Sequence, residues 1–167
     1  MTSVLIVDDE PGALETLSDI LTAKGYEVKT AKNGTSALVL TAKGPFDLAI
    51  LDIKMPDVDG TELLKTLKTL YPELEAIMVT GFATIENAVS AMENGALAYL
   101  LKPLKMDEVL IYLERALNKQ KARMELAQKK RELERFNKLA EGRELREGEV
   151  KKGINALLAK LGRPPKY

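Results

Sequence analysis

The chain of 167 residues contains no cysteine and no histidine. Without cysteine it has no disulfide, no thiol nucleophile and no thiolate ligand for a metal, which fits a reducing compartment. Without histidine it lacks the commonest general base and the usual phosphate carrier of phosphorelays. Any phosphoryl chemistry in this protein must therefore use carboxylates and take its phosphoryl group from another molecule.

Long apolar runs are also missing. No stretch approaches the roughly 20 apolar residues of a membrane span, and residues 1–4 lead directly into a strand-like run without the features of a signal peptide. Tryptophan is absent, aromatic residues make up 5% of the chain and charged residues 30%, as in a globular protein rich in helix. We therefore expect a cytoplasmic protein with no membrane partner.

The zero net charge hides an uneven distribution of charged residues. Residues 1–117 carry 10 Lys and Arg against 18 Asp and Glu, whereas residues 118–167 carry 15 against 7. The net charge is therefore −8 in the first part and +8 in the second. This distribution predicts an acidic globular part followed by a basic tail.

Short apolar runs alternate five times with amphipathic stretches. The runs predict strands at Ser3–Val7, Glu27–Ala31, Leu48–Leu51, Ala76–Thr80 and Ala98–Leu101. The stretches predict helices from Pro11 to about Gly25, at Thr35–Lys43, Thr61–Leu70 and Thr84–Asn94, and from Asp107 onward. Such alternation is typical of an α/β fold in which a doubly wound parallel sheet has helices on both faces. The run Glu27–Ala31 alternates polar and apolar residues, as an edge strand does.

Polar residues stand where four of these strands end, namely Asp8, Asp9, Asp52, Thr80 and Lys102. Sites in doubly wound sheets lie beyond the carboxyl ends of the strands, so we expect these side chains to meet at one rim. Three carboxylates repel one another unless a hard cation binds them, and Mg²⁺ accepts oxygen ligands while leaving room for phosphate. One carboxylate can then act as a nucleophile that forms an aspartyl phosphate, while Lys102 neutralises the phosphoryl group.

Four motifs occur in order along the first part of the chain: "LIVDDE", "LAILDIKMPDVDG", "IMVTG" and "AYLLKP". With these motifs the chain resembles the receiver domain of bacterial two-component response regulators. The resemblance covers residues 1–119 and leaves residues 120–167 as a separate basic helical tail. It implies a flavodoxin-like sheet of five strands in the order 2-1-3-4-5.

The resemblance also implies a role for each site residue. Carried over by position, the metal site consists of the acidic pair Asp8 and Asp9, of Asp52, and of the Lys54 backbone carbonyl, which binds Mg²⁺. Asp52 is also the phosphoacceptor, and Lys102 binds the phosphoryl group. Thr80 and Tyr99 are the switch residues. The implied function is a phosphorylation-dependent switch. Its partners would be a sensor histidine kinase, which supplies the phosphoryl group, and a downstream protein.

Two further positions bear on the lifetime of the phosphorylated state. In receiver domains the residues two after the phosphoacceptor and two after the switch hydroxyl flank the path of attacking water, and here they are Lys54 and Phe82. Neither side chain is a carboxylate or an amide that could orient a water molecule. We therefore expect no enzyme activity beyond slow self-dephosphorylation.

An alternative interpretation starts from Asp57-Val-Asp-Gly-Thr61, which matches the nucleophile motif of haloacid dehalogenase-like phosphatases. In that family the first aspartate closes a buried strand and would act with Asp59 and Mg²⁺. Here Pro56 stands immediately before Asp57, and the strand has already ended at Asp52. A loop whose Asp59 leads into a helix is the simpler explanation.

The tail pattern predicts two helical segments, interrupted near Gly142. Apolar positions extend one helix to about Ala140, although their spacing slips between Met124 and Leu126 and Gly142 weakens the pattern. We expect a coiled coil there, followed by a short amphipathic helix at 150–161. The tail could form a homodimer, dock to a partner, or bind nucleic acid through its basic residues. Glutamates interleaved among the lysines favour protein interaction over nucleic acid.

Overall fold

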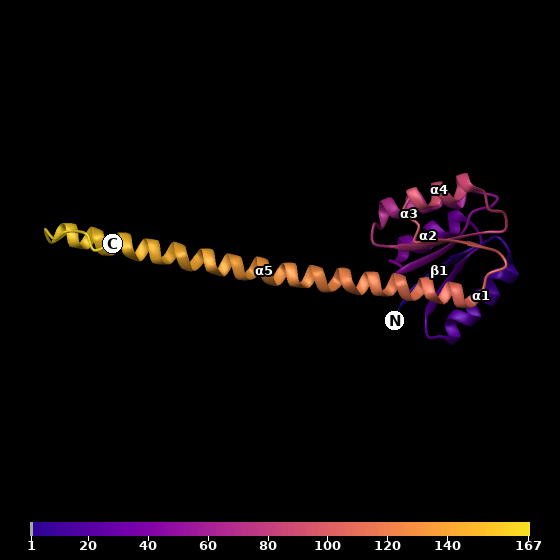
Figure 1. The fold of residues 1–167 in the computed structure, drawn as a ribbon, viewed down its shortest axis with the longest axis horizontal. Helices are drawn as coiled ribbons and strands as arrows, with labels where there is room; N and C mark the ends of the chain where they lie inside the picture. The colour runs from indigo at the N-terminus through magenta and orange to yellow at the C-terminus, as the bar shows by residue number, and fades with distance from the viewer. Residues whose placement is uncertain (1) are drawn as a thin grey trace. The chain divides into compact units, whose positions relative to one another are not determined.

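The computed structural model describes residues 2–167. Within these residues five strands alternate with five helices: β1 Ser3–Val7, α1 Pro11–Ala23, β2 Glu27–Ala31, α2 Gly34–Lys43, β3 Leu48–Asp52, α3 Gly60–Leu70, β4 Glu75–Thr80, α4 Ile85–Glu93, β5 Ala98–Leu101 and α5 Met106–Lys160. All neighbouring strands pair in parallel, in the order β2-β1-β3-β4-β5. Figure 1 shows these strands with the helices around them. The predicted fold class and strand order are confirmed, and β2 is an edge strand as expected.

Helices cover both faces of the sheet. On one face, α1 and the beginning of α5 pack through the buried residues Leu14, Leu17, Leu21, Val109, Leu113 and Ala116. On the other face, α2, α3 and α4 pack through Ala37, Leu63, Leu64, Leu67 and Ala91. Every residue of β3 and β4 is buried, because these central strands have helices on both sides. The parallel register brings the carboxyl ends of the strands to one edge of the sheet, where the site lies.

A polar network connects the amino ends of the strands, opposite the site, to α5. Glu75 is fully buried at the start of β4 and pairs with Lys119 Nζ at 3.0 Å. Gln120 Nε2 donates to the Asp47 carbonyl and carboxylate oxygens at 3.3 Å each. By the pattern of their internal contacts, residues 1–120 and 121–167 form two compact units.

The helical tail is continuous, which corrects the predicted break. A single helix, α5, runs through Gly142, Gly148 and Gly153 to Lys160. A glycine inside a helix costs only about 1 kcal/mol relative to alanine, and the residues around these glycines are mostly strong helix formers. The helix ends at Lys160. Two residues further on, Gly162 has a φ of +67°, and the Arg163 N–H donates to the Leu158 carbonyl.

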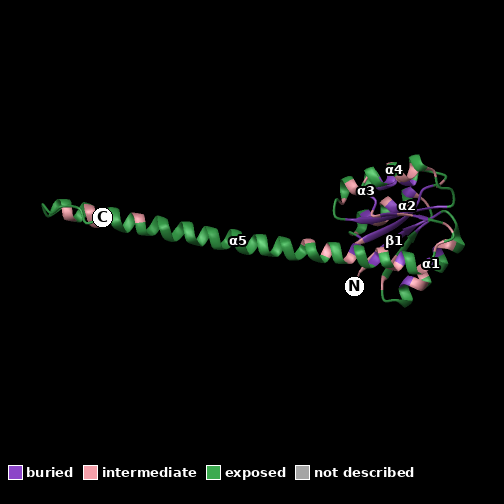
Figure 2. Ribbon diagram, in the orientation of Figure 1, coloured by how far each residue is buried: buried purple, intermediate pink, exposed green. Residues whose placement is uncertain are grey.

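The tail helix is exposed along its length. From residue 121 to residue 160 no residue is buried (Figure 2). Among residues 2–167, no helix has both the length and the apolar composition needed to cross a bilayer.

Candidate functional site

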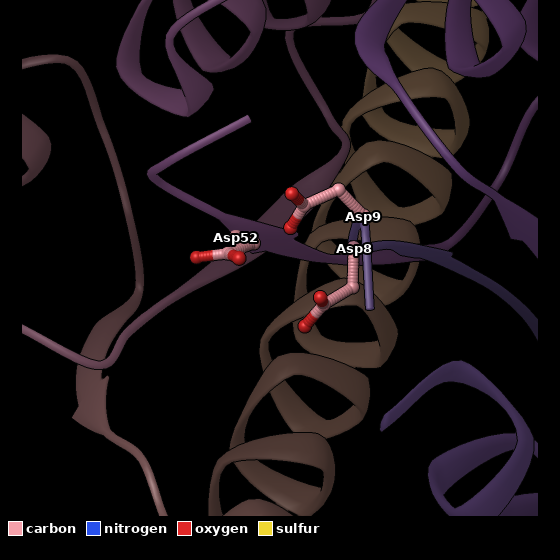
Figure 3. A group of neighbouring side chains, drawn as sticks. All are labelled: Asp8, Asp9 and Asp52. Atoms are coloured by element: carbon pink, nitrogen blue, oxygen red, sulfur yellow. The ribbon is translucent and has the colours of Figure 1, made fainter. Parts of the chain in front are cut away.

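Three aspartates meet at the carboxyl edge of the sheet. Asp8 and Asp9 directly follow β1, and Asp52 is the last residue of β3. Each offers a carboxylate oxygen within 4.8 Å of the other two, and Figure 3 shows the three side chains gathered at one edge of the sheet. Asp8 and Asp52 are buried, whereas Asp9 is exposed. The predicted acidic cluster is therefore present, with one carboxylate open to solvent.

Lys102 joins this cluster from the residue after β5. Its Nζ lies 2.7 Å from Asp8 Oδ2 and 3.1 Å from Asp52 Oδ2. Burial raises the pKa of the Asp52 carboxyl, and the hydrogen bond and charge of Lys102 offset only part of that rise. Burial also acts to lower the pKa of Lys102, but its hydrogen bonds to Asp8 and Asp52 outweigh this effect and raise it. The lysine therefore stays charged and holds two of the three carboxylates.

Lys54 lies at the mouth of the site. Its backbone N–H donates to Asp52 Oδ1 at 3.3 Å, which orients the carboxylate that the resemblance to receiver domains implies is the phosphoacceptor. Its Nζ lies 5.1 Å from the centre of the Phe82 ring, within the range of a cation–π contact. Lys54 thus links the loop after β3 to the loop after β4.

The two predicted switch residues occupy different environments. Thr80 is fully buried at the end of β4. Its hydroxyl donates to the Phe82 carbonyl at 3.1 Å and accepts from the Phe82 N–H at 3.2 Å. The Tyr99 hydroxyl is buried and has no hydrogen-bond partner among the described residues. Any inward movement of Tyr99 would therefore start from a hydroxyl that is already buried.

Gly60 shapes the site, a role that the sequence analysis did not assign to it. Its N–H donates to the Ile53 carbonyl at 2.7 Å. A side chain at Gly60 would overlap the backbone of Asp52 and Ile53. Because only hydrogen fits there, the start of α3 can pack directly against the strand end that carries Asp52.

The site has the charge and ligand chemistry of a divalent-cation site. Three carboxylates against one ammonium leave a net charge of −2 in a partly buried cluster. A hard cation with oxygen ligands would remove this repulsion, as Mg²⁺ does in carboxylate sites. An exposed Asp9 beside two buried aspartates also leaves one ligand reachable from solvent.

Comparison with known proteins places this geometry in a family. The family model for the response regulator receiver domain matches residues 4–114. The chain belongs to this family. Among solved structures, it is similar to a CheY-like response regulator receiver domain protein from Methanospirillum hungatei, with a TM-score of 0.71 and 38% identity over 74% of this chain and 98% of the other.

Other relatives of this receiver domain are longer proteins. It is 39% identical over 114 residues to the transcriptional regulatory protein ZraR of Klebsiella oxytoca, covering 68% of this chain and 26% of ZraR. It is 37% identical to the regulatory protein AtoC of Escherichia coli, covering 74% of this chain and 27% of AtoC. The NtrX structure from Brucella abortus, in complex with ADP, matches with a TM-score of 0.71 and 36% identity over 76% of this chain and 30% of NtrX. The chain thus spans about a quarter of the length of the curated relatives it matches.

The two aspartates of the phosphatase interpretation have other partners. Asp57 accepts hydrogen bonds from the N–H groups of Gly34 and Thr35 at the start of α2. Asp59 accepts from the Thr61 N–H at 2.7 Å and is the N-cap of α3. Both carboxylates therefore stabilise helix starts, and the receiver family match leaves the phosphatase alternative without support.

Proposed function

We propose that Asp52 accepts a phosphoryl group from a sensor histidine kinase and that the resulting aspartyl phosphate changes the surface that a downstream protein recognises. The observation that supports this most directly is the buried Asp52 carboxylate, held by Lys102 beside two further aspartates. Since the chain has no histidine, the donor belongs to the partner. An Asp52 oxygen attacks phosphorus, a P–O bond forms, and the P–N bond to the donor histidine breaks.

Each neighbour of Asp52 has a distinct role in this proposal. Asp8, Asp9 and Asp52, with the Lys54 carbonyl, would hold Mg²⁺. When bound, the metal supplies positive charge to the transferring phosphoryl group. Lys102 already contacts Asp52, so its ammonium needs only a small movement to bind a phosphoryl oxygen. The Lys54 N–H keeps Asp52 oriented at the strand end.

Thr80 and Tyr99 carry the signal away from the site in this proposal. The Thr80 hydroxyl would exchange its bonds to the Phe82 backbone for a bond to a phosphoryl oxygen. That exchange frees the loop before α4, and the unpaired Tyr99 hydroxyl can then find a partner. New charge at Asp52 thus shifts a population between two arrangements.

The tail, residues 121–167, serves protein interaction in this proposal, including association with a second copy of the chain. Binding of nucleic acid through its basic residues is the alternative. The two differ in the response to salt, because binding to random duplex DNA depends steeply on salt concentration. Retained binding to such DNA at physiological ionic strength would favour the alternative. The cytoplasmic location expected from the sequence stays a prediction.

Intact-mass measurement after incubation with acetyl phosphate and Mg²⁺ tests the phosphoacceptor. Wild type should gain one phosphoryl group, and Asp52→Asn should gain none. Asp57→Asn is the matched control, because it removes a nearby carboxylate from the same loop region and should leave uptake unchanged. Equal uptake by Asp52→Asn and wild type would contradict the assignment. Loss of uptake in Asp57→Asn alone would instead support the phosphatase interpretation.

A further inference from the structure

The exposed tail helix carries a seven-residue repeat of apolar side chains. One row consists of Leu126, Leu133, Ala140, Glu147, Ile154 and Leu161, and the other of Ala122, Lys129, Phe136, Arg143, Val150 and Leu157. Rows offset by three and four residues lie side by side on a helix and form the seam of a two-stranded coiled coil. Nine of the twelve positions are apolar. Most of this seam lies after the slip between Met124 and Leu126, and it continues to Leu161, one residue past the end of the helix.

Most of the seam is exposed within the tail, although Ile154 is half-buried. Leu133 is 60% exposed, Phe136 69% and Leu157 63%. The C-terminal residues fold back beside the helix, where Asn155 binds the backbone of Lys166 and Tyr167, but they leave Leu157 open. Three glycines also weaken the isolated helix by about 1 kcal/mol each. Since exposed helices depend on packing for stability, we expect the seam to be covered by another helix.

The polar residues of the seam indicate which partner and which direction. Arg143 and Glu147 occupy successive layers. In a parallel pair Arg143 would face Arg143 of the second copy, and Glu147 would face Glu147 of the second copy. Two core layers would then each hold a pair of like charges. In an antiparallel pair centred on Leu145, Arg143 of each copy faces Glu147 of the other. Like charges across an interface cost several kcal/mol, whereas opposite charges fix the register.

The same antiparallel register suits the other layers. Leu133 then faces Leu157 of the second copy, Phe136 faces Ile154, and Ala140 faces Val150. Lys129 faces Leu161 at each end, where its long side chain can reach water. The paired region covers residues 129–161, about 50 Å of helix at 1.5 Å per residue.

The flanking positions are compatible with this register. Glu132 lies beside Lys160 of the second copy, which pairs opposite charges. At the two-fold axis, Glu144 lies near Glu144 of the second copy, and Arg146 near Arg146 of the second copy. These positions border solvent, where salt screens the repulsion. The self-pairs therefore oppose the register less than two like-charged core layers would oppose a parallel one.

We propose that two copies of this chain associate through an antiparallel coiled coil of residues 129–161, with Arg143 of each copy paired with Glu147 of the other. This inference rests on the protein-interaction role proposed for the tail. It is independent of phosphoryl transfer at Asp52.

Light scattering of the full unphosphorylated chain tests the association. Wild type should be a dimer, and Leu133→Asp should be monomeric because it places a charge in the seam. Leu145→Asp is the matched control, since Leu145 lies on the opposite side of the helix and its variant should remain dimeric. A monomeric wild type at all concentrations, or an equal effect of the two substitutions, would overturn the proposal. Phosphoryl uptake should be the same in all three proteins, so the failure of either proposal is visible separately.

Disulfide formation tests the direction, since the chain has no cysteine of its own. Ala140→Cys alone should not cross-link, because in the antiparallel pair the two introduced cysteines lie about 15 Å apart along the axis, beyond the reach of a disulfide. A mixture of Ala140→Cys and Val150→Cys should cross-link into a heterodimer. Cross-linking of Ala140→Cys with itself would indicate a parallel pair and refute the register.

A charge exchange tests the pairing itself. Arg143→Glu should raise the dissociation constant about tenfold or more, because it sets two pairs of glutamates face to face. Adding Glu147→Arg should restore the dissociation constant to within about threefold of wild type. In a parallel pair Arg143→Glu would only replace one like-charged layer by another, so an unchanged dissociation constant would contradict the proposal.

Discussion

The contact between Lys54 and Phe82 should set how long an aspartyl phosphate at Asp52 survives. Lys54 lies in the loop after β3 and Phe82 in the loop after β4, and these strands are neighbours in the sheet. Their cation–π contact, at 5.1 Å, therefore bridges two loops beyond the strand end that carries Asp52. Since neither side chain can take a proton from water, the pair should shield the phosphoryl group without assisting its hydrolysis.

The size of the effect follows from the contact and from the replacements. A cation–π contact between exposed groups contributes about 0.5–1 kcal/mol. Its loss should raise the fraction of molecules in which the two loops are apart and water can reach the phosphoryl group, by about two- to fivefold. Phe82→Leu should speed hydrolysis by that factor alone. The Lys54→Asn, Phe82→Glu double variant also introduces groups that orient water, and we expect about tenfold or more, equivalent to roughly 1.4 kcal/mol of barrier.

The assay follows the mass of the phosphorylated protein over time after the donor is removed, with Mg²⁺ held constant. Lys29→Asn is the control, because it removes another cation–π contact, to Phe46, away from Asp52. It should decay as slowly as wild type. Equal decay rates for wild type and the double variant would refute the idea that these side chains limit hydrolysis.

Three further predictions concern the site and its supports. Asp9→Ala should abolish Mg²⁺ binding, measured by calorimetry, because it removes a carboxylate ligand. It should leave thermal stability unchanged, because Asp9 is exposed and the substitution removes nothing from the core. Gly60→Ala should destabilise the protein by about 1–3 kcal/mol in urea unfolding and slow phosphoryl uptake, because its Cβ displaces the Asp52 backbone. Hydrogen bonds from Thr35 hold the pKa of Asp57 below its ordinary value of 3.8, so this carboxylate stabilises the fold above about pH 4 and loses that contribution as pH falls through its lowered pKa. Asp57→Asn should therefore lower stability at pH 7, and the difference from wild type should shrink toward pH 2.

The tail shows why local pattern alone misplaced a helix end. Gly142 and Gly148 predicted a break between two helical segments, yet α5 continues through both. A glycine penalty of about 1 kcal/mol is small beside the propensity of the surrounding residues, and the first proline after them, Pro164, lies beyond Lys160. The strands, in contrast, were predicted to within a residue, because apolar runs bounded by turns leave few alternatives.

Some residues that shape the site carry no signal in the sequence. Gly60 acts through the Asp52 and Ile53 backbone, which only the packed chain brings close to it. Asp57 looked like a candidate nucleophile by its motif, but its carboxylate binds the start of α2, more than 20 residues away in sequence. A motif specifies residue types and spacing, and it does not specify which helix start a carboxylate will reach.

The sequence by itself determined the α/β class, the alternation of strands and helices, and the set of polar residues at the strand ends, because side-chain periodicity and strand termini are local properties. The resemblance to receiver domains supplied the strand order. Only the tertiary structure decided that Lys102 contacts both Asp8 and Asp52, and that Lys54 reaches Phe82. These contacts join separate strands and loops, and their distances depend on how the helices pack against the two faces of the sheet.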